Sequence, residues 1–64
     1  MDFQLLFKIR KLKEELRKTD YKAIKHFEGW LTDEEYAETR AERQHIRDEI
    51  NRLEAELIQQ ELHK

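Results

Sequence analysis

Apolar residues recur along this chain at alternating spacings of four and three residues, which places their side chains on one face of an α-helix. There are two such series: Leu5, Ile9, Leu12 and Leu16, then Ile46, Ile50, Leu53 and Leu57. The two series lie symmetrically about position 31, so two helices that reverse direction there would bring them into contact. We call these eight residues the seam. They predict an all-α fold, an antiparallel two-helix hairpin that resembles a short coiled coil.

The residues around position 31 favour a turn at 29–32. Gly29, the one glycine of the chain, suits the left-handed position that ends many helices. Thr32 and Glu35 have the spacing of a capping box, in which each side chain binds the backbone amide of the other residue. Leu31 and Tyr36 flank this cap and fit a hydrophobic staple. The next helix should therefore begin directly after Thr32.

The chain is expected to form one domain that covers residues 1–64. Its order is a helix at about 3–28, a turn at 29–32 and a helix at about 33–62. Thr19 and Asp20 could cap a new helix start, so a kink or restart there is the alternative to one continuous first helix. The absence of proline, and of glycine at this point, favours a continuous helix.

Length and composition indicate that the chain acts with a partner. A chain of 64 residues buries too little surface to be more than marginally stable alone. It has no cysteine, so disulfides are excluded as a source of stability. No apolar run approaches the length of a membrane span, and we expect no such span. Self-association, or binding to a different protein, is the remaining way to stabilise the fold.

Charge divides unequally between the two expected helices. Residues 1–28 contain eight bases and five acids, a net charge of +3, whereas residues 29–64 contain five bases and ten acids, a net charge of −5. Opposite charge on neighbouring helices favours the antiparallel hairpin over the parallel pairing of two like helices. The seam, the turn and the charge together therefore predict the same fold.

Several large apolar residues lie off the seam and gather at the two ends of the expected hairpin. The open end, where the chain termini meet, has Phe3, Leu6, Phe7, Ile58 and Leu62. The turn end has Tyr21, Ile24, Phe27, Trp30, Leu31 and Tyr36. Contiguous exposed apolar surface is typical of interfaces. The predicted interface residues are Phe3, Leu6, Phe7, Ile24, Phe27, Trp30, Tyr36, Ile58 and Leu62. They could join copies of the chain, most simply as a dimer that forms a helical bundle, or dock onto a different protein, and the two can coexist.

Candidate chemistry is sparse, and we expect no enzymatic activity and no cofactor. Glu42 and His45 form a single Glu-x-x-His pair, whereas di-metal helical bundles use two such pairs with further glutamates. The chain has neither serine nor cysteine, so the common acyl-transfer nucleophiles are missing. A basic stripe on the first helix could bind phosphates or a membrane surface, but the net charge of −2 makes nucleic acid a poor partner.

The stretch from residue 16 to residue 57 resembles small helical proteins of phages and prophages of Gram-positive bacteria, and helical ends of phage tail-region proteins. The resembling segments are TDYKAIK at 19–25, EGWLT at 28–32, EEYA at 34–37, RAERQ at 40–44 and IRDEINRLE at 46–54. The resemblance implies a viral origin and no reaction. It implies either a module that binds and inhibits a host protein, such as a defence component, in the bacterial cytoplasm, or a structural coiled coil of a virion or tail module.

Overall fold

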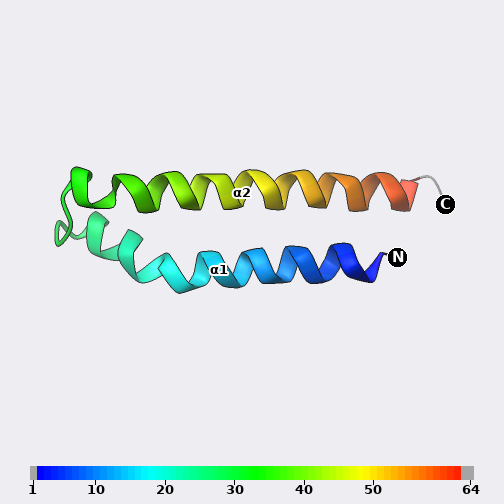
Figure 1. Ribbon diagram of the computed structural model, residues 1–64, viewed down its shortest axis with the longest axis horizontal. Coiled ribbons are helices and arrows are strands. Elements are labelled where there is room, and N and C mark those ends of the chain that lie inside the picture. Colours follow the sequence, from blue (N-terminus) through cyan, green and yellow to red (C-terminus); the bar gives the residue numbers. More distant parts are fainter. Residues whose placement is uncertain (1, 63–64) are drawn as a thin grey trace.

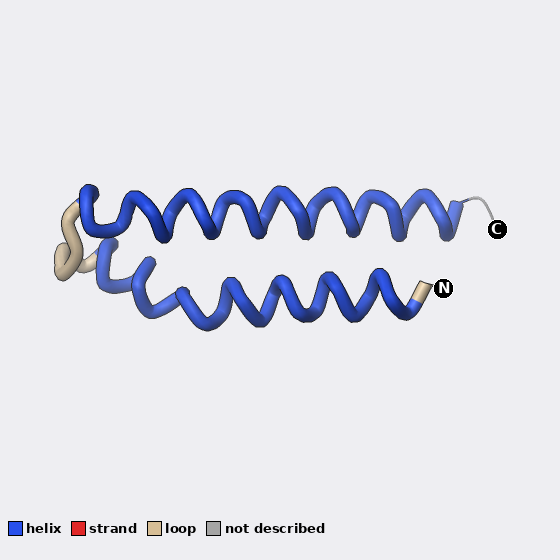
Figure 2. The backbone as a smooth tube through the Cα atoms, in the orientation of Figure 1, coloured by secondary structure: helices blue, strands red, loops and turns tan. Residues whose placement is uncertain are grey.

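Two long helices packed side by side in opposite directions make up the fold (Figure 1). The structure, a computed structural model, describes residues 2–62. Helix α1 spans Phe3–Phe27 and helix α2 spans Asp33–Leu62. They form a rod of 48 × 15 × 14 Å, with the start of α1 and the end of α2 at the same end (Figure 2). The predicted antiparallel hairpin is therefore confirmed.

At the end of helix α1, backbone amides of the turn donate hydrogen bonds to two of the last carbonyl groups of the helix. The amide of Gly29 donates to the carbonyl of His26 at 3.1 Å, and the amide of Trp30 donates to the carbonyl of Lys25 at 2.8 Å. These two bonds define a Schellman motif, with Gly29 in the left-handed region at φ +85°. The helix ends one residue earlier than predicted, because Glu28 is its cap.

Helix α2 begins with the predicted capping box. The amide of Glu35 donates to the Thr32 hydroxyl at 3.1 Å, and the amide of Thr32 donates to the Glu35 carboxylate at 3.2 Å. Three acids, Asp33, Glu34 and Glu35, occupy its first turn, where negative charge is favoured by the helix dipole. The turn is thus held from both sides by short-range hydrogen bonds.

The hydrophobic core is the predicted seam. Four of its residues are buried, and they are Leu5, Ile9, Ile50 and Leu53. The other four are partly buried against them, and they are Leu12, Leu16, Ile46 and Leu57. All eight lie in the half of the hairpin nearer its open end. We call this part the aliphatic half of the seam.

The seam extends beyond these eight residues toward the turn, where Thr19, Thr39 and Arg43 interrupt the apolar pattern of the sequence. Three more pairs keep the same spacing and the same symmetry about position 31: Thr19 with Arg43, Ala23 with Thr39, and His26 with Tyr36. Arg43 is hydrogen-bonded to Thr19, and the His26 and Tyr36 rings are stacked. Thr39, Arg43 and Tyr36 are all buried. We call these three pairs the polar half of the seam.

Helix α1 is continuous through Thr19 and Asp20, so no new helix starts there. It nevertheless bends toward α2 as it approaches the turn (Figure 1). Near this bend the Thr19 hydroxyl donates to the Leu16 carbonyl at 3.1 Å, and an Arg43 nitrogen donates to the same carbonyl at 2.8 Å. Side chains that compete for a helix carbonyl are a known cause of bending.

Candidate functional site

Arg43 joins the two helices at the centre of the polar half. Its side chain is 8% exposed. One terminal nitrogen, Nη1, donates to the Leu16 carbonyl and to the Thr19 hydroxyl, both at 2.8 Å. The other, Nη2, donates to the Asp20 carboxylate at 2.9 Å. Its Nε has no hydrogen-bond partner within the described part of the chain. Arg43 thus links α2 to α1 by hydrogen bonds and an ion pair, and we call this set of contacts the clasp.

A second polar group closes the hairpin beside the turn. The Nε2 atom of His26 lies 2.6 Å from the Asp33 carboxylate, and the His26 ring stacks on Tyr36 with centroids 4.5 Å apart. The guanidinium of Arg40 lies 5.3 Å from the centre of the Tyr36 ring and 4.0 Å from Asp33. Because these contacts link the end of α1 to the first two turns of α2, they fix the direction in which the turn points.

Charge partners shift the pKa of a few groups that are not buried. The hydrogen bond and the charge of His26 hold the pKa of Asp33 below its ordinary value of 3.8. Glu49 and Arg52 form a bidentate pair, with contacts of 2.8 to 3.2 Å. This pairing lowers the pKa of Glu49 and raises that of Arg52. None of these groups is buried, so the shifts reflect local pairing and not a desolvated catalytic centre.

The exposed apolar residues lie at the two ends of the rod, as predicted. At the open end, Phe3, Phe7, Ile58 and Leu62 are 68%, 66%, 59% and 76% exposed. At the turn end, Tyr21, Ile24, Phe27 and Trp30 are 53%, 57%, 91% and 75% exposed. These eight residues include seven of the nine predicted interface positions. That they contact a partner stays a prediction.

Two predicted interface residues behave differently. Tyr36 is only 7% exposed because its ring stacks on His26, so it belongs to the polar half of the seam and not to the exposed surface. Leu6 is partly buried. The position of Tyr36 opposite His26, symmetric about position 31, is the sequence signal that could have placed it in the seam.

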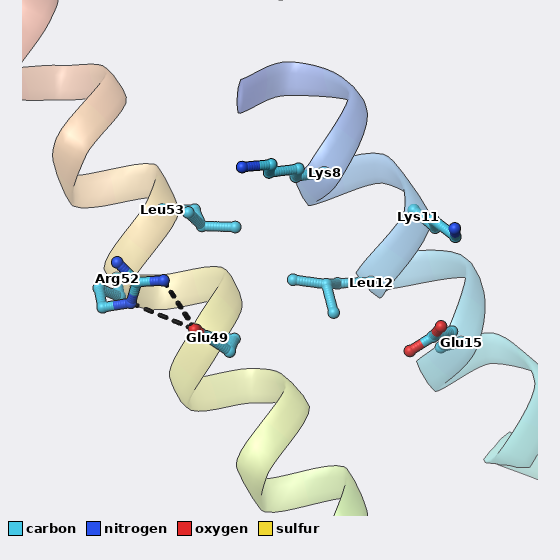
Figure 3. A pocket seen from close by; sticks show the side chains of 7 residues that line it. All are labelled: Lys8, Lys11, Leu12, Glu15, Glu49, Arg52 and Leu53. Carbon is cyan, nitrogen blue, oxygen red and sulfur yellow. Dashed lines mark hydrogen bonds and ion pairs between the residues drawn. The ribbon is translucent and has the colours of Figure 1, made fainter. Parts of the chain in front are cut away.

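An open groove of about 280 Å³ runs between the helices beside the aliphatic half (Figure 3). Leu12 from α1 and Leu53 from α2 point toward each other at its floor. Charged side chains form its rim, and they are Lys8, Lys11, Glu15, Glu49 and Arg52. The groove is thus an open channel with a floor of two leucines and charged side chains around it.

The described residues show no arrangement that would hold a metal. No group of three His, Cys, Asp or Glu side chains between residues 2 and 62 has the geometry of a metal site. Within the same range, neither helix is long and apolar enough to cross a membrane.

Comparisons with protein-family models, with curated proteins and with solved structures found no match for this chain.

Proposed function

We propose that this chain is a non-enzymatic protein–protein interaction module of the phage type that its sequence resembles, and that it binds and inhibits a host protein in the bacterial cytoplasm. The observation that carries the proposal is the pair Phe27 and Trp30 at the turn, which is 91% and 75% exposed. Large aromatic side chains supply much of the binding free energy at protein interfaces. Such exposure is unfavourable for a chain that acts alone.

The construction of the turn supports this proposal. Trp30 follows Gly29 inside the Schellman motif, and its own amide is hydrogen-bonded to Lys25. The capping box and the contact between His26 and Asp33 hold the other side of the turn. A backbone that is already ordered before binding loses less conformational entropy when a partner docks. The turn therefore presents its aromatic residues in a fixed arrangement.

A capture experiment tests the proposal. The full chain, Trp30→Ala and Phe27→Ala serve as baits in lysate of the bacterial host, and the captured protein is then purified. We expect each turn-end substitution to raise the Kd for that protein by about 30-fold or more, the effect of losing an anchor worth about 2 kcal/mol. Leu62→Ala, which removes a similarly exposed residue at the open end, is the matched control.

Helix content and host activity complete the test. Circular dichroism should be the same for all four proteins, because none of the substituted side chains is buried. The purified host protein should lose activity when wild type is added and keep it with Trp30→Ala. Equal affinity of wild type and Trp30→Ala for the captured protein would contradict the proposal.

The second candidate function is a structural coiled coil in a phage virion or tail module. One observation favours it: α2 extends past the start of α1 at the open end, where Ile58 and Leu62 are exposed (Figure 1). Another helix could cover these residues and continue the coiled coil. For this function, capture from purified virions should depend on Leu62 and not on Trp30. The same four baits thus separate the two functions.

A further inference from the structure

The face of α1 directed away from the seam carries an ordered series of exposed side chains. Six of them, at spacings of four and three residues, are Phe3, Phe7, Arg10, Glu14, Arg17 and Tyr21. Each precedes a seam residue by two positions, which is a rotation of about 200° around the helix. The series therefore forms one stripe on the far side of α1 from α2. We call it the outer stripe.

The outer stripe is self-complementary for a second, antiparallel copy. Suppose that α1 of one copy lies antiparallel against α1 of another, with stripe residues facing each other as the seam residues do in the hairpin. Three kinds of contact then form. Phe3 meets Tyr21, Phe7 meets Arg17, and Arg10 meets Glu14 of the second copy. Each contact occurs twice, as a two-fold symmetric interface requires.

We propose that two copies of this chain pair through their outer stripes, α1 against antiparallel α1. Aromatic side chains pack on each other at both ends of the interface, and Arg17 lies over the Phe7 ring in a cation–π contact. Glu14, which already binds Arg17 of its own helix at 2.7 Å, gains Arg10 of the other copy. Every layer therefore joins groups that attract each other.

Other faces of the hairpin fit a second copy less well. The far side of α2 carries Ala41, Asp48 and Ala55 at the corresponding positions and has no aromatic anchor among them. The groove side carries charged side chains around Leu12 and Leu53, and no aromatic residue lines it. The outer stripe combines apolar ends with opposite charges, so it is the favoured face.

The dimer goes beyond the proposed function because it uses a different surface. Phe27 and Trp30 do not belong to the outer stripe, so they stay accessible to a foreign partner. Loss of the dimer would leave capture through Trp30 in place, and loss of capture would leave the dimer in place. The two proposals can therefore fail separately.

Charge reversal tests the register of this interface. In Glu14→Arg both central pairs become Arg against Arg, and in Arg10→Glu both become Glu against Glu. By sedimentation equilibrium over a wide concentration range, we expect a dimer for wild type. Each single variant should dissociate with a Kd raised by about tenfold or more, because two attractive pairs become repulsive. Asp48→Arg, the same change of charge on the far side of α2, is the matched control and should dimerise like wild type.

Mixing the two variants gives the decisive result. Glu14→Arg and Arg10→Glu have complementary central charges, so an equimolar mixture should form a heterodimer about as stable as the wild-type dimer. Circular dichroism should show full helix content in each sample, since both positions are exposed. A wild-type monomer at all concentrations would overturn the proposal. So would a dimer that is indifferent to both reversals, or a mixture that is no more associated than its components.

Discussion

The aliphatic and polar halves of the seam use one spacing for two different purposes. In the aliphatic half, pairs such as Ile9 and Leu53 exclude water without directional contacts. In the polar half, Arg43 makes three hydrogen bonds to α1, and His26 stacks on Tyr36. Apolar burial supplies most of the free energy of folding, but it tolerates shifted registers. Hydrogen bonds to particular atoms do not tolerate such shifts. The aliphatic half therefore supplies most of the stability, and the polar half fixes how the two helices are aligned.

The aliphatic half should show the largest effect of a single substitution. Ile50→Ala removes a side chain that is 6% exposed, and we expect a loss of about 2–5 kcal/mol in the free energy of unfolding. Leu12→Ala should cost less, because Leu12 is partly buried and borders the open groove. Chemical denaturation of both variants measures the difference. A larger loss for Leu12→Ala would show that the core is centred elsewhere.

The polar half should respond to Arg43 in a way that depends on the replacement. Arg43→Ala leaves the Thr19 and Asp20 side chains without their partner and should cost about 1–3 kcal/mol. Arg43→Leu fills the space with an apolar side chain and should keep the melting temperature close to that of wild type. Without the clasp, however, the leucine variant should populate other registers or oligomers. Amide exchange and sedimentation detect these states. A leucine variant with a single native register would contradict the alignment role of Arg43.

The turn that both halves share should show a smaller effect. Gly29→Ala places an L side chain at φ +85°, and we expect a loss of about 1–2 kcal/mol. Apart from the glycine and its two chain neighbours, no described residue has an atom within 4 Å of the added carbon, so we expect backbone strain to be the main cost. Gly29→Asn should lose less, because asparagine tolerates the left-handed region. Thermal melting of the two variants provides the check, and equal stability of Gly29→Ala and wild type would contradict the Schellman geometry.

The smallest expected effect is a dependence on acid pH at the turn. Since the pKa of Asp33 is lower in the folded chain than its ordinary value of 3.8, the contact with His26 stabilises the fold above that pH. This contribution is lost as the pH falls through the lowered pKa. Asp33→Asn should therefore flatten the acid limb of the stability curve. Glu34→Gln is the control, because it removes a neighbouring acid and leaves the contact with His26 intact. Identical acid limbs for the two variants would contradict the role of this contact.

Much of the fold was predictable because its determinants are local. The spacing of Leu5 to Leu16 identifies a buried helix face, and Gly29 and the Thr32 capping box mark the ends of two helices by short-range chemistry. The sequence shows Thr19, Thr39 and Arg43 as interruptions of the apolar pattern, but it does not show their hydrogen bonds or the burial of Thr39 and Arg43. Thr19 and Arg43 resemble solvated surface residues when only their polarity is considered. Their symmetry about position 31 was the available signal. Whether their polar atoms find hydrogen-bond partners depends on which residues of the other helix face them.

The candidate site was predictable to a different degree. Exposure of Phe27 and Trp30 follows from their positions outside the seam, and the structure confirms it. Tyr36 was wrongly grouped with them, because its stacking partner, His26, is in the other helix. The contact between His26 and Asp33 also forms across the turn, between residues of the two helices. Such contacts follow from the register of the hairpin, which has to be established first.

The placement of Arg43 and the leucines along the rod also bears on how the hairpin forms. His26 and Tyr36 are 10 residues apart in the chain, whereas Leu5 and Leu57 are 52 residues apart. Closing the longer loop costs about 1.5 kcal/mol more in chain entropy. The contacts that are quickest to form are therefore the polar ones, and the strongest ones form last. A hairpin that closes in this order gains most of its stability only when the leucines meet, so forms that are closed only near the turn stay sparsely populated.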